Sequence, residues 1–215
     1  MPPSTWAAAP PPRGSAAITS LRNLIPTADI RLLIMDHMDL SSVVSAAKDF
    51  AETQPKLHGL IANAGIVAEK GSGGVWSQYG MSKLANILHA KELDRLYGPG
   101  GVKKGESGGE IWTAAVHPGD VYTDLSRNAM FFGISGLVAA RVLNAFGAFT
   151  PAEKGAYTSV FCAASAEMEG HMSVGYFVPL GKVAKPSRHA RDGELGMKLW
   201  AWSVDESGGK GKNLL

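Results

Sequence analysis

Two kinds of hydrophobic pattern alternate along the chain, and together they predict an α/β protein. Short continuous apolar runs are typical of strands buried on both faces of a sheet, whereas apolar residues three and four apart are typical of helices. The strand candidates are 30–35, 57–62, 111–116 and 176–179. The helix candidates are 15–24, 41–53, 78–97 and 150–164. Strands alternating with helices indicate a layered fold with a mostly parallel sheet.

Polar residues at the helix boundaries suggest where the helices begin. Ser41 and Ser42 are potential N-caps for the helix at 41–53, and Ser77 is a potential N-cap for the helix at 78–97. Residues 150–153 read Thr-Pro-Ala-Glu, which combines a capping box with a proline at the first helical position.

The two ends of the chain differ in composition from its centre. Five of the twelve prolines fall within the first twelve residues, so we expect a disordered or extended Pro/Ala-rich arm over residues 1–14. Residues 203–215 are rich in Gly, Ser and Lys, which predicts a flexible tail. Between them, 215 residues with 45% apolar types can bury one sizeable core, so residues 15–202 are expected to form a single domain.

Charge and cysteine content narrow the function classes. The net charge of +2 and the absence of a basic stripe argue against nucleic acid as a partner. A single cysteine, Cys162, excludes an intramolecular disulfide framework and favours a reducing, cytoplasmic compartment. The six histidines lack metal-ligand spacing, so no metal site is expected.

One long apolar segment raises the question of a membrane. Residues 130–149 are almost wholly apolar, but Arg141 and Asn144 interrupt them, and a charge near the middle of a membrane span is costly. We therefore expect a helical flap over the substrate, or a surface that makes peripheral membrane contact, in preference to a true span.

The clearest chemical signal is the pair Tyr79 and Lys83. Four residues are about one helical turn, so the phenol and the ammonium project from one face of a helix. A neighbouring ammonium favours the phenolate and lowers the phenol pKa. A tyrosine so placed can exchange a proton with a carbonyl or an alcohol near neutral pH. Taken alone, the pair is more often an ordinary exposed pair on an amphipathic helix.

Four ordered motifs, taken together, resemble those of the short-chain dehydrogenase/reductase family. Within that family the resemblance is to the retinol-dehydrogenase-like branch. The resemblance covers roughly residues 13–202. Its motifs are Met38-Asp39-Leu40 with two serines after it, Leu60-Ile61-Ala62-Asn63-Ala64-Gly65, Tyr79-x-x-x-Lys83-Leu-Ala-Asn86, and His117-Pro118-Gly119-x-Val121-x-Thr123-x-Leu125.

The resemblance implies roles for these residues. Tyr79 would be the catalytic acid/base, and Lys83 would lower its pKa and hold the nicotinamide ribose hydroxyls. Asp39 would accept a hydrogen bond from the adenine amino group, although it could simply precede a helix. The remaining cofactor contacts would be Asn63, Ala64 and Gly65 along the cofactor and Pro118, Gly119, Val121 and Thr123 in a loop against the nicotinamide.

Two parts of the family pattern have no counterpart here. No strand followed by a Gly-rich phosphate-binding turn is found near residue 13, and the 13 residues between Gly65 and Tyr79 are too few for the family's helix, strand and catalytic serine. Ser72 is a weak candidate for that serine. We therefore predict an incomplete Rossmann-like, doubly wound parallel sheet that lacks its first βαβ unit and the helix-strand unit before the Tyr79 helix.

The implied activity is that of an NAD(P)-dependent oxidoreductase. It would transfer hydride between the nicotinamide and a carbonyl or secondary alcohol, on a small hydrophobic substrate covered by the flap. NADP is slightly favoured, because Arg13 would fall where a basic residue meets the NADP phosphate. The alternatives are a catalytically inactive remnant, arising from a splice form or a gene-model fragment, a partner-binding protein, and a membrane-associated scaffold. The sequence leaves the substrate, the reaction direction and the oligomeric state open.

Overall fold

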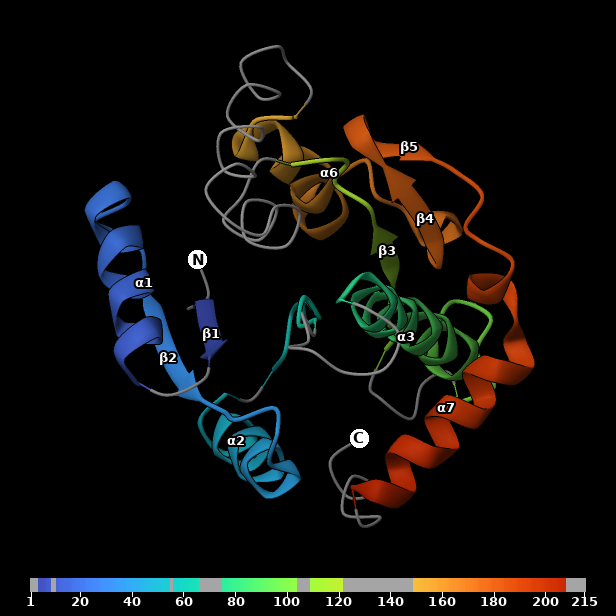
Figure 1. Ribbon diagram of the computed structural model, residues 1–215, viewed down its shortest axis with the longest axis horizontal. Helices are drawn as coiled ribbons and strands as arrows, with labels where there is room; N and C mark the ends of the chain where they lie inside the picture. Colours follow the sequence, from blue (N-terminus) through green and yellow to red (C-terminus); the bar gives the residue numbers. More distant parts are fainter. Residues whose placement is uncertain are drawn as a thin grey trace. The chain divides into compact units, whose positions relative to one another are not determined.

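The computed structural model describes residues 4–8, 11–54, 56–65, 75–103, 109–121 and 149–207 (Figure 1). The chain divides into two compact units. The first comprises Met1–Leu60 with Trp202–Leu215, and the second comprises Ile61–Ala201. Each unit is described by itself below.

The first unit contains a parallel βαβ arrangement. Strand β1 (Ser4–Ala8) is followed by helix α1 (Pro11–Leu24) and strand β2 (Ile30–Ile34). The two strands pair in parallel, from Ser4 opposite Ile30 to Ala8 opposite Ile34. In α1, Ile18 is buried, and so is Ile30 at the start of β2. This is the packing expected of a crossover helix lying on its sheet.

Within the arm predicted to be disordered or extended over residues 1–14, residues 4–8 form β1, and the rest of the described arm is the first turn of α1. The ladder with β2 satisfies the backbone groups of β1 that face β2. Pro11 and Pro12 occupy the first turn of α1, where a proline removes no intrahelical hydrogen bond.

Helix α2 (Leu40–Thr53) begins one residue earlier than expected, with a different cap. Asp39 is the N-cap, and its carboxylate accepts a hydrogen bond from the backbone N–H of Ser41 at 2.8 Å. Ser42 instead accepts a hydrogen bond from the N–H of Asp36, which closes the preceding loop. The predicted caps at the two serines are thus replaced by a carboxylate, which also interacts favourably with the helix dipole.

The segment 56–65 is not a strand, contrary to the expectation for 57–62. Its backbone is irregular, and Leu60 and Ile61 are 73% and 72% exposed. A strand persists only where a neighbour satisfies its N–H and C=O groups, and no strand in the described ranges pairs with this one. The apolar composition that signals a buried strand is present, but none of the described strands lies beside it as a sheet partner.

The second unit is built around a three-stranded sheet with β4 in the middle. Strand β3 (Ala114–Val116) runs parallel to β4 (Gly175–Val178), and β5 (Lys182–Val183) runs antiparallel to it. The strand predicted at 111–116 is thus shortened to three residues, whereas the one at 176–179 is confirmed to within a residue. The short 3-10 helices are η1 (Gly170–Met172), η2 (Pro179–Gly181) and η3 (His189–Arg191).

The core of this unit lies between β4 and helix α6 (Ala152–Ala164). Phe177 of β4 is fully buried, and its ring centroid lies 6.1 Å from that of Phe161. The buried Thr158 hydroxyl bonds to Val178 O and accepts the N–H of Gly181, both at 3.3 Å. These contacts fix α6 across the sheet and the turn that follows it.

Helix α6 begins without the predicted capping box. Pro151 is the N-cap, and no side chain caps the helix. Thr150 forms a parallel bridge with Val121, and its N–H donates to Asp120 O at 2.8 Å. The threonine backbone is therefore held by strand-like pairing and is not available to begin a capped helix.

Two long helices complete the unit. Helix α3 (Val75–Tyr97) carries the Tyr79 motif and begins before Ser77, so Ser77 lies in its first turn and is not its cap. Helix α7 (Gly193–Glu206) was not predicted, and its last residues occupy what we expected to be the start of the tail. Asp192 caps it by accepting the N–H of Leu195 at 3.1 Å.

Candidate functional site

Four side chains of α3 lie on one face of the helix. Tyr79, Ser82, Lys83 and Asn86 are spaced three, four and seven residues apart, which places them on one stripe. This stripe faces the irregular segment at 62–65. The structure therefore brings Asn63, Ala64 and Gly65, which the sequence pattern assigned to the cofactor, against the predicted catalytic pair.

Side chains of α3 hold the backbone of this segment. The Lys83 ammonium donates to Asn63 O at 2.9 Å. The Asn86 amide donates to Ala62 O at 3.2 Å and to Ala64 O at 3.1 Å. Three successive carbonyl groups are thus bound by two side chains one turn apart. These contacts compensate in part for the missing sheet partners of the segment.

Glycine at position 65 allows a close approach. A Cβ atom there would lie 3.1 Å from Lys83 Cε and 3.3 Å from Tyr79 Cε2. Both distances are tighter than ordinary van der Waals contact, so a larger residue would require the Lys83 and Tyr79 side chains to shift. The role predicted for Gly65, close backbone approach, is consistent with this geometry.

The electrostatic setting of Lys83 differs from that of a lysine in water. Its ammonium lies 5.6 Å from the centroid of the Tyr79 ring, within the range of a cation–π contact. Desolvation by burial lowers the pKa of Lys83. The side chain releases its proton more readily than an exposed lysine, and it is held within reach of the phenol face. Ser82 donates from its hydroxyl to Tyr79 O at 2.8 Å and so stays within the helix.

The segment 117–121 is placed by its own contacts. His117 N–H donates to Phe177 O at 2.8 Å, and its Nδ1 accepts the N–H of Gly119 at 3.1 Å. Gly119 has φ of +84°, and a Cβ there would lie 3.0 Å from the Pro179 ring. His117 therefore stabilises the turn that follows β3, and Pro118 and Gly119 lie in that turn.

Other predicted site residues have more limited descriptions. Asp39 belongs to the first unit, where it caps α2. Val121 forms the bridge to Thr150 and presses on α6, because a Cβ at Gly155 would meet Val121 Cγ2. Thr123, Ser72 and all but the last residue of the flap at 130–149 lie outside the described residues.

Two further expectations concern Cys162 and metals. Cys162 is half-buried in α6, and burial raises the pKa of its thiol, which disfavours the thiolate and agrees with a packing role. Within the described ranges, no group of three or more His, Cys, Asp or Glu side chains is arranged to hold a metal ion. In those same ranges, no helix is long and apolar enough to cross a membrane.

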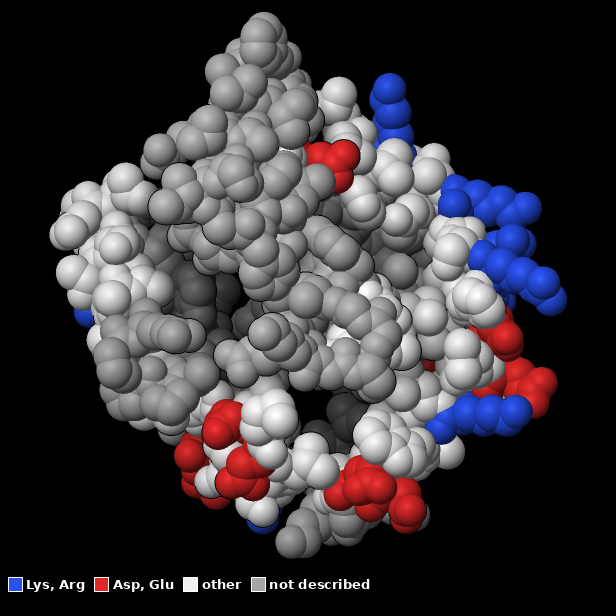
Figure 2. Space-filling view, viewed as in Figure 1, with Lys and Arg blue, Asp and Glu red and all other residues white. Residues whose placement is uncertain are grey.

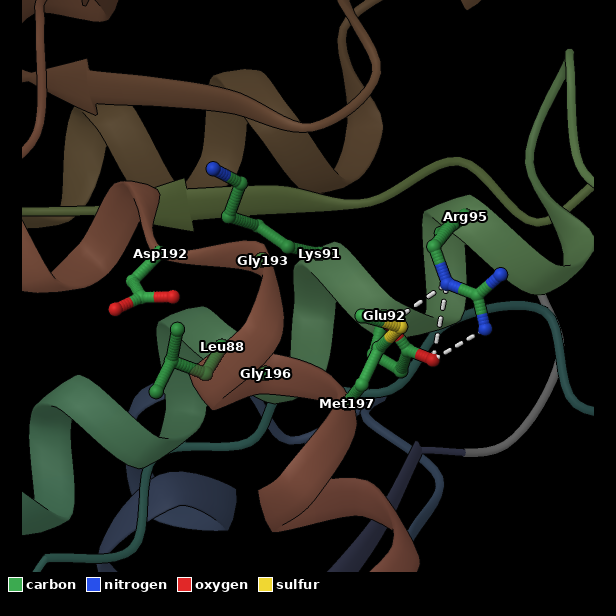
Figure 3. Close-up of a pocket in the computed structure, with 8 residues that line it drawn as sticks. All are labelled: Leu88, Lys91, Glu92, Arg95, Asp192, Gly193, Gly196 and Met197. Carbon is green, nitrogen blue, oxygen red and sulfur yellow. Dashed lines mark hydrogen bonds and ion pairs between the residues drawn. The ribbon is translucent and has the colours of Figure 1, made fainter.

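A cavity of about 260 Å³ lies on the opposite face of α3, against the start of α7 (Figure 3). Leu88 lies nine residues after Tyr79, which is two and a half helical turns, so the two side chains project from opposite sides of α3. Glu92 forms one wall and receives two hydrogen bonds from Arg95 Nε and one from its Nη2, at 2.6–3.0 Å. The cavity is lined by Leu88, Lys91, Glu92, Arg95, Asp192, Gly193, Gly196 and Met197.

This ion pair yields a prediction about stability. The Glu92 side chain is only 6% exposed, whereas that of Arg95 is 47% exposed. Replacing Arg95 with methionine leaves a buried carboxylate without its partner, so we expect the free energy of unfolding to fall by about 1–3 kcal/mol. Chemical denaturation measures the change.

The double variant Glu92→Leu/Arg95→Met is the control for this prediction. It removes both charges together, and we expect it to recover most of the lost stability, because an apolar pair of similar volume needs no charge compensation. A double variant as unstable as Arg95→Met would show that the arginine acts through packing and not through its charge.

Charges of both signs lie side by side on the visible face of the second unit (Figure 2). Basic side chains gather over β5 and the segment that leads to α7, and acidic side chains adjoin them near the start of α7. The exposed basic residues of this stretch are Lys182, Lys185, Arg188 and Arg191. Because charges of both signs are present, this surface is an ordinary solvated one and not a patch of a single sign.

Comparisons with known proteins identify the same family as the sequence motifs. No protein-family model matches the chain. It is 36% identical to the short-chain dehydrogenase/reductase drtF of Aspergillus calidoustus, and the alignment covers 91% of this chain and 82% of that protein. The chain belongs to the short-chain dehydrogenase/reductase family. Membership makes a general oxidoreductase role the expected one, since the family is named for it.

Two further relatives match over shorter stretches. The short chain dehydrogenase/reductase dpfgH of Gibberella zeae is 34% identical, over 64% of this chain and 36% of that protein. The chloroplastic short-chain dehydrogenase TIC 32 B of Brassica napus is 37% identical, over 59% of this chain and 35% of that protein.

A solved structure supports the fold alone. The crystal structure of an uncharacterized protein from Mycobacterium paratuberculosis aligns with a TM-score of 0.59 at 19% identity, over 95% of this chain and 83% of that one. The predicted α/β, partly Rossmann-like fold is thereby confirmed.

Proposed function

We propose that this chain binds NAD(P) and interconverts a carbonyl and a secondary alcohol on a small hydrophobic substrate. The bound nicotinamide supplies or accepts the hydride. In the reducing direction, Tyr79 gives its hydroxyl proton to the substrate oxygen as the carbonyl carbon gains the hydride. In the oxidising direction, the phenolate takes that proton back.

The observation that carries the proposal is the contact between α3 and Asn63–Gly65. Lys83 binds Asn63 O, and Gly65 lies so close to Tyr79 and Lys83 that a Cβ would not fit without movement. The chemistry of these residues suits a nicotinamide riboside, because an ammonium and a phenol are partners for ribose hydroxyls.

The other residues have supporting roles in this proposal. Ala64 lines the cofactor beside Asn63, and Asp39 accepts a hydrogen bond from the adenine amino group. The loop against the nicotinamide consists of Pro118, Gly119, Val121 and Thr123. The turn at Gly119, with its positive φ, gives this loop a fixed course after β3.

NADP is slightly favoured over NAD on the charge of Arg13. Arg13 belongs to the first turn of α1, which follows β1. A helix N-terminus attracts anions, and the arginine adds a positive charge that would suit the extra phosphate of NADP. Comparing the dissociation constants for NADPH and NADH tests this preference directly.

The experiment that tests the function is a cofactor titration. Quenching of the fluorescence of the five tryptophans reports binding of NADPH or NADH. We expect saturable binding, weakened about tenfold or more in Lys83→Met, because a hydrogen bond to a charged group is lost. Lys91→Met is the matched control. It removes a lysine on the same helix that donates to Ala190 O, away from the Tyr79 face.

Absence of saturable binding at millimolar cofactor would reject the enzymatic proposal for this chain. Equal weakening in Lys83→Met and Lys91→Met would also count against it, since the effect would then come from the helix as a whole and not from the ribose partner.

A catalytically inactive family member, acting through a partner, is the second candidate. The alignment with the Aspergillus relative spans 265 positions, yet 91% of 215 residues is about 196, so about 69 positions stand opposite gaps in this chain. Leu60 and Ile61 are largely exposed, as expected where neighbouring strands are lacking. Sequencing the transcript tests this candidate, because an mRNA that encodes the Gly-rich turn and the serine strand would dismiss it.

A further inference from the structure

The side-chain amide of Asn86 contacts the candidate site, but Asn86 has no role in the proposed reaction. Its Nδ2 donates to Ala62 O at 3.2 Å and to Ala64 O at 3.1 Å. A carbonyl oxygen can only accept, so both contacts require the NH₂ end of the amide to face the segment. The two N–H groups therefore bind two carbonyls that flank a third.

That third carbonyl belongs to Asn63 and is the acceptor for Lys83. Its two neighbours along the backbone are both bound by Asn86, so their hydrogen bonds restrict the direction of the carbonyl between them. The Asn63 carbonyl is the polar atom that positions the Lys83 ammonium. The position of the ammonium beside the Tyr79 ring thus depends on a residue one turn further along α3.

The residue type fits this task. An amide NH₂ carries two donors for the two acceptors, whereas a serine hydroxyl has one donor and a carboxylate has none. A lysine or arginine would bring a second positive charge next to Lys83, which would further disfavour its ammonium form.

We propose that Asn86 is a positioning residue: by clamping the Ala62 and Ala64 carbonyls it fixes the Asn63 carbonyl, and thereby sets the place of the Lys83 ammonium beside Tyr79. The inference rests on the proposed function for its consequence in catalysis. Its structural part is the position of the Lys83 ammonium, which is tested without any cofactor.

The test compares Asn86→Leu with the wild-type chain and with Lys91→Met. Leucine has similar volume and no donors, and Lys91→Met removes one side-chain-to-backbone hydrogen bond from the opposite face of α3. The pKa of Lys83 is followed by NMR of ¹³C-labelled lysine side chains during a pH titration. The dissociation constant for NADPH is measured by tryptophan fluorescence on the same preparations.

In Asn86→Leu we expect the Lys83 pKa to rise toward the ordinary lysine value, because a released segment no longer desolvates the ammonium. NADPH binding should weaken about tenfold. Lys91→Met should change neither quantity. Asn86→Gln keeps both donors on a longer stem and should fall between the wild type and Asn86→Leu.

The outcomes separate the two proposals. A folded Asn86→Leu variant with an unchanged Lys83 pKa and unchanged NADPH affinity would overturn the positioning role, whether or not the chain is an enzyme. A shifted Lys83 pKa with no cofactor binding in any variant would support the positioning role and reject the enzymatic function.

A wild-type measurement covers the case in which Asn86→Leu fails to fold. Scalar couplings across hydrogen bonds should link the Asn86 side-chain NH₂ to the carbonyl carbons of Ala62 and Ala64. Absence of both couplings in the folded protein would overturn the inference.

Discussion

Replacing Tyr79 with phenylalanine is expected to lower turnover by about 10²–10⁴-fold while leaving cofactor affinity nearly unchanged. The change removes one hydroxyl and keeps the ring that packs near Gly65 and the Lys83 ammonium. The proton needed at the substrate oxygen would then have to come from water. Oxidation of NADPH, followed by its absorbance with a panel of hydrophobic ketones and aldehydes, measures the effect.

The matched control for this prediction is Tyr97→Phe. Tyr97 is the last residue of α3, is buried, and lies five turns from Tyr79. If loss of the Tyr97 hydroxyl also lowers turnover, the effect comes from reduced stability of the fold and not from a missing proton donor. A Tyr79→Phe variant that turns over at the wild-type rate would exclude Tyr79 as the proton donor.

Replacing Phe177 with alanine is expected to lower the free energy of unfolding by about 3–5 kcal/mol. Phe177 is fully buried in the central strand of its sheet, between Val116 of β3 and Val183 of β5. Its ring packs on Phe161, and its backbone oxygen accepts the N–H of His117. Urea denaturation followed by circular dichroism measures the loss.

Tyr157→Ala is the matched control for the core. Tyr157 lies on α6 and is 55% exposed, so removal of a similar ring there should cost well under half as much. If Phe177→Ala is unfolded under all conditions, Phe177→Leu provides a milder change with the same direction. Equal losses at positions 177 and 157 would show that the β4 ring does not anchor the core.

The spacing of Tyr79 and Lys83 was enough to predict their shared face, because four residues make about one turn of any α-helix. The contact of this face with Asn63–Gly65 was implied only by the resemblance to the family. No local rule says that residues 63 and 83 meet. That contact depends on hydrogen bonds from Lys83 and Asn86 to backbone carbonyls 20 and more residues away.

The strand predicted at 57–62 shows where local pattern fails. Leu60 and Ile61 have the composition of a buried strand, yet both are exposed in an irregular segment. At β1, by contrast, a stretch predicted only to be disordered or extended forms a strand by pairing with β2. In both places the availability of a neighbouring strand decided the outcome, and propensity alone did not.

The sequence by itself determined the family, the α/β class and the helix that carries Tyr79 and Lys83, because these depend on periodicity and on short ordered motifs. Only the tertiary structure decided that Asp39 caps α2, that Asn86 clamps the backbone around Asn63, and that α7 covers the opposite face of α3. Such features require atoms from distant segments to lie within hydrogen-bonding or packing distance, and that information is not contained in the spacing of residues along the chain.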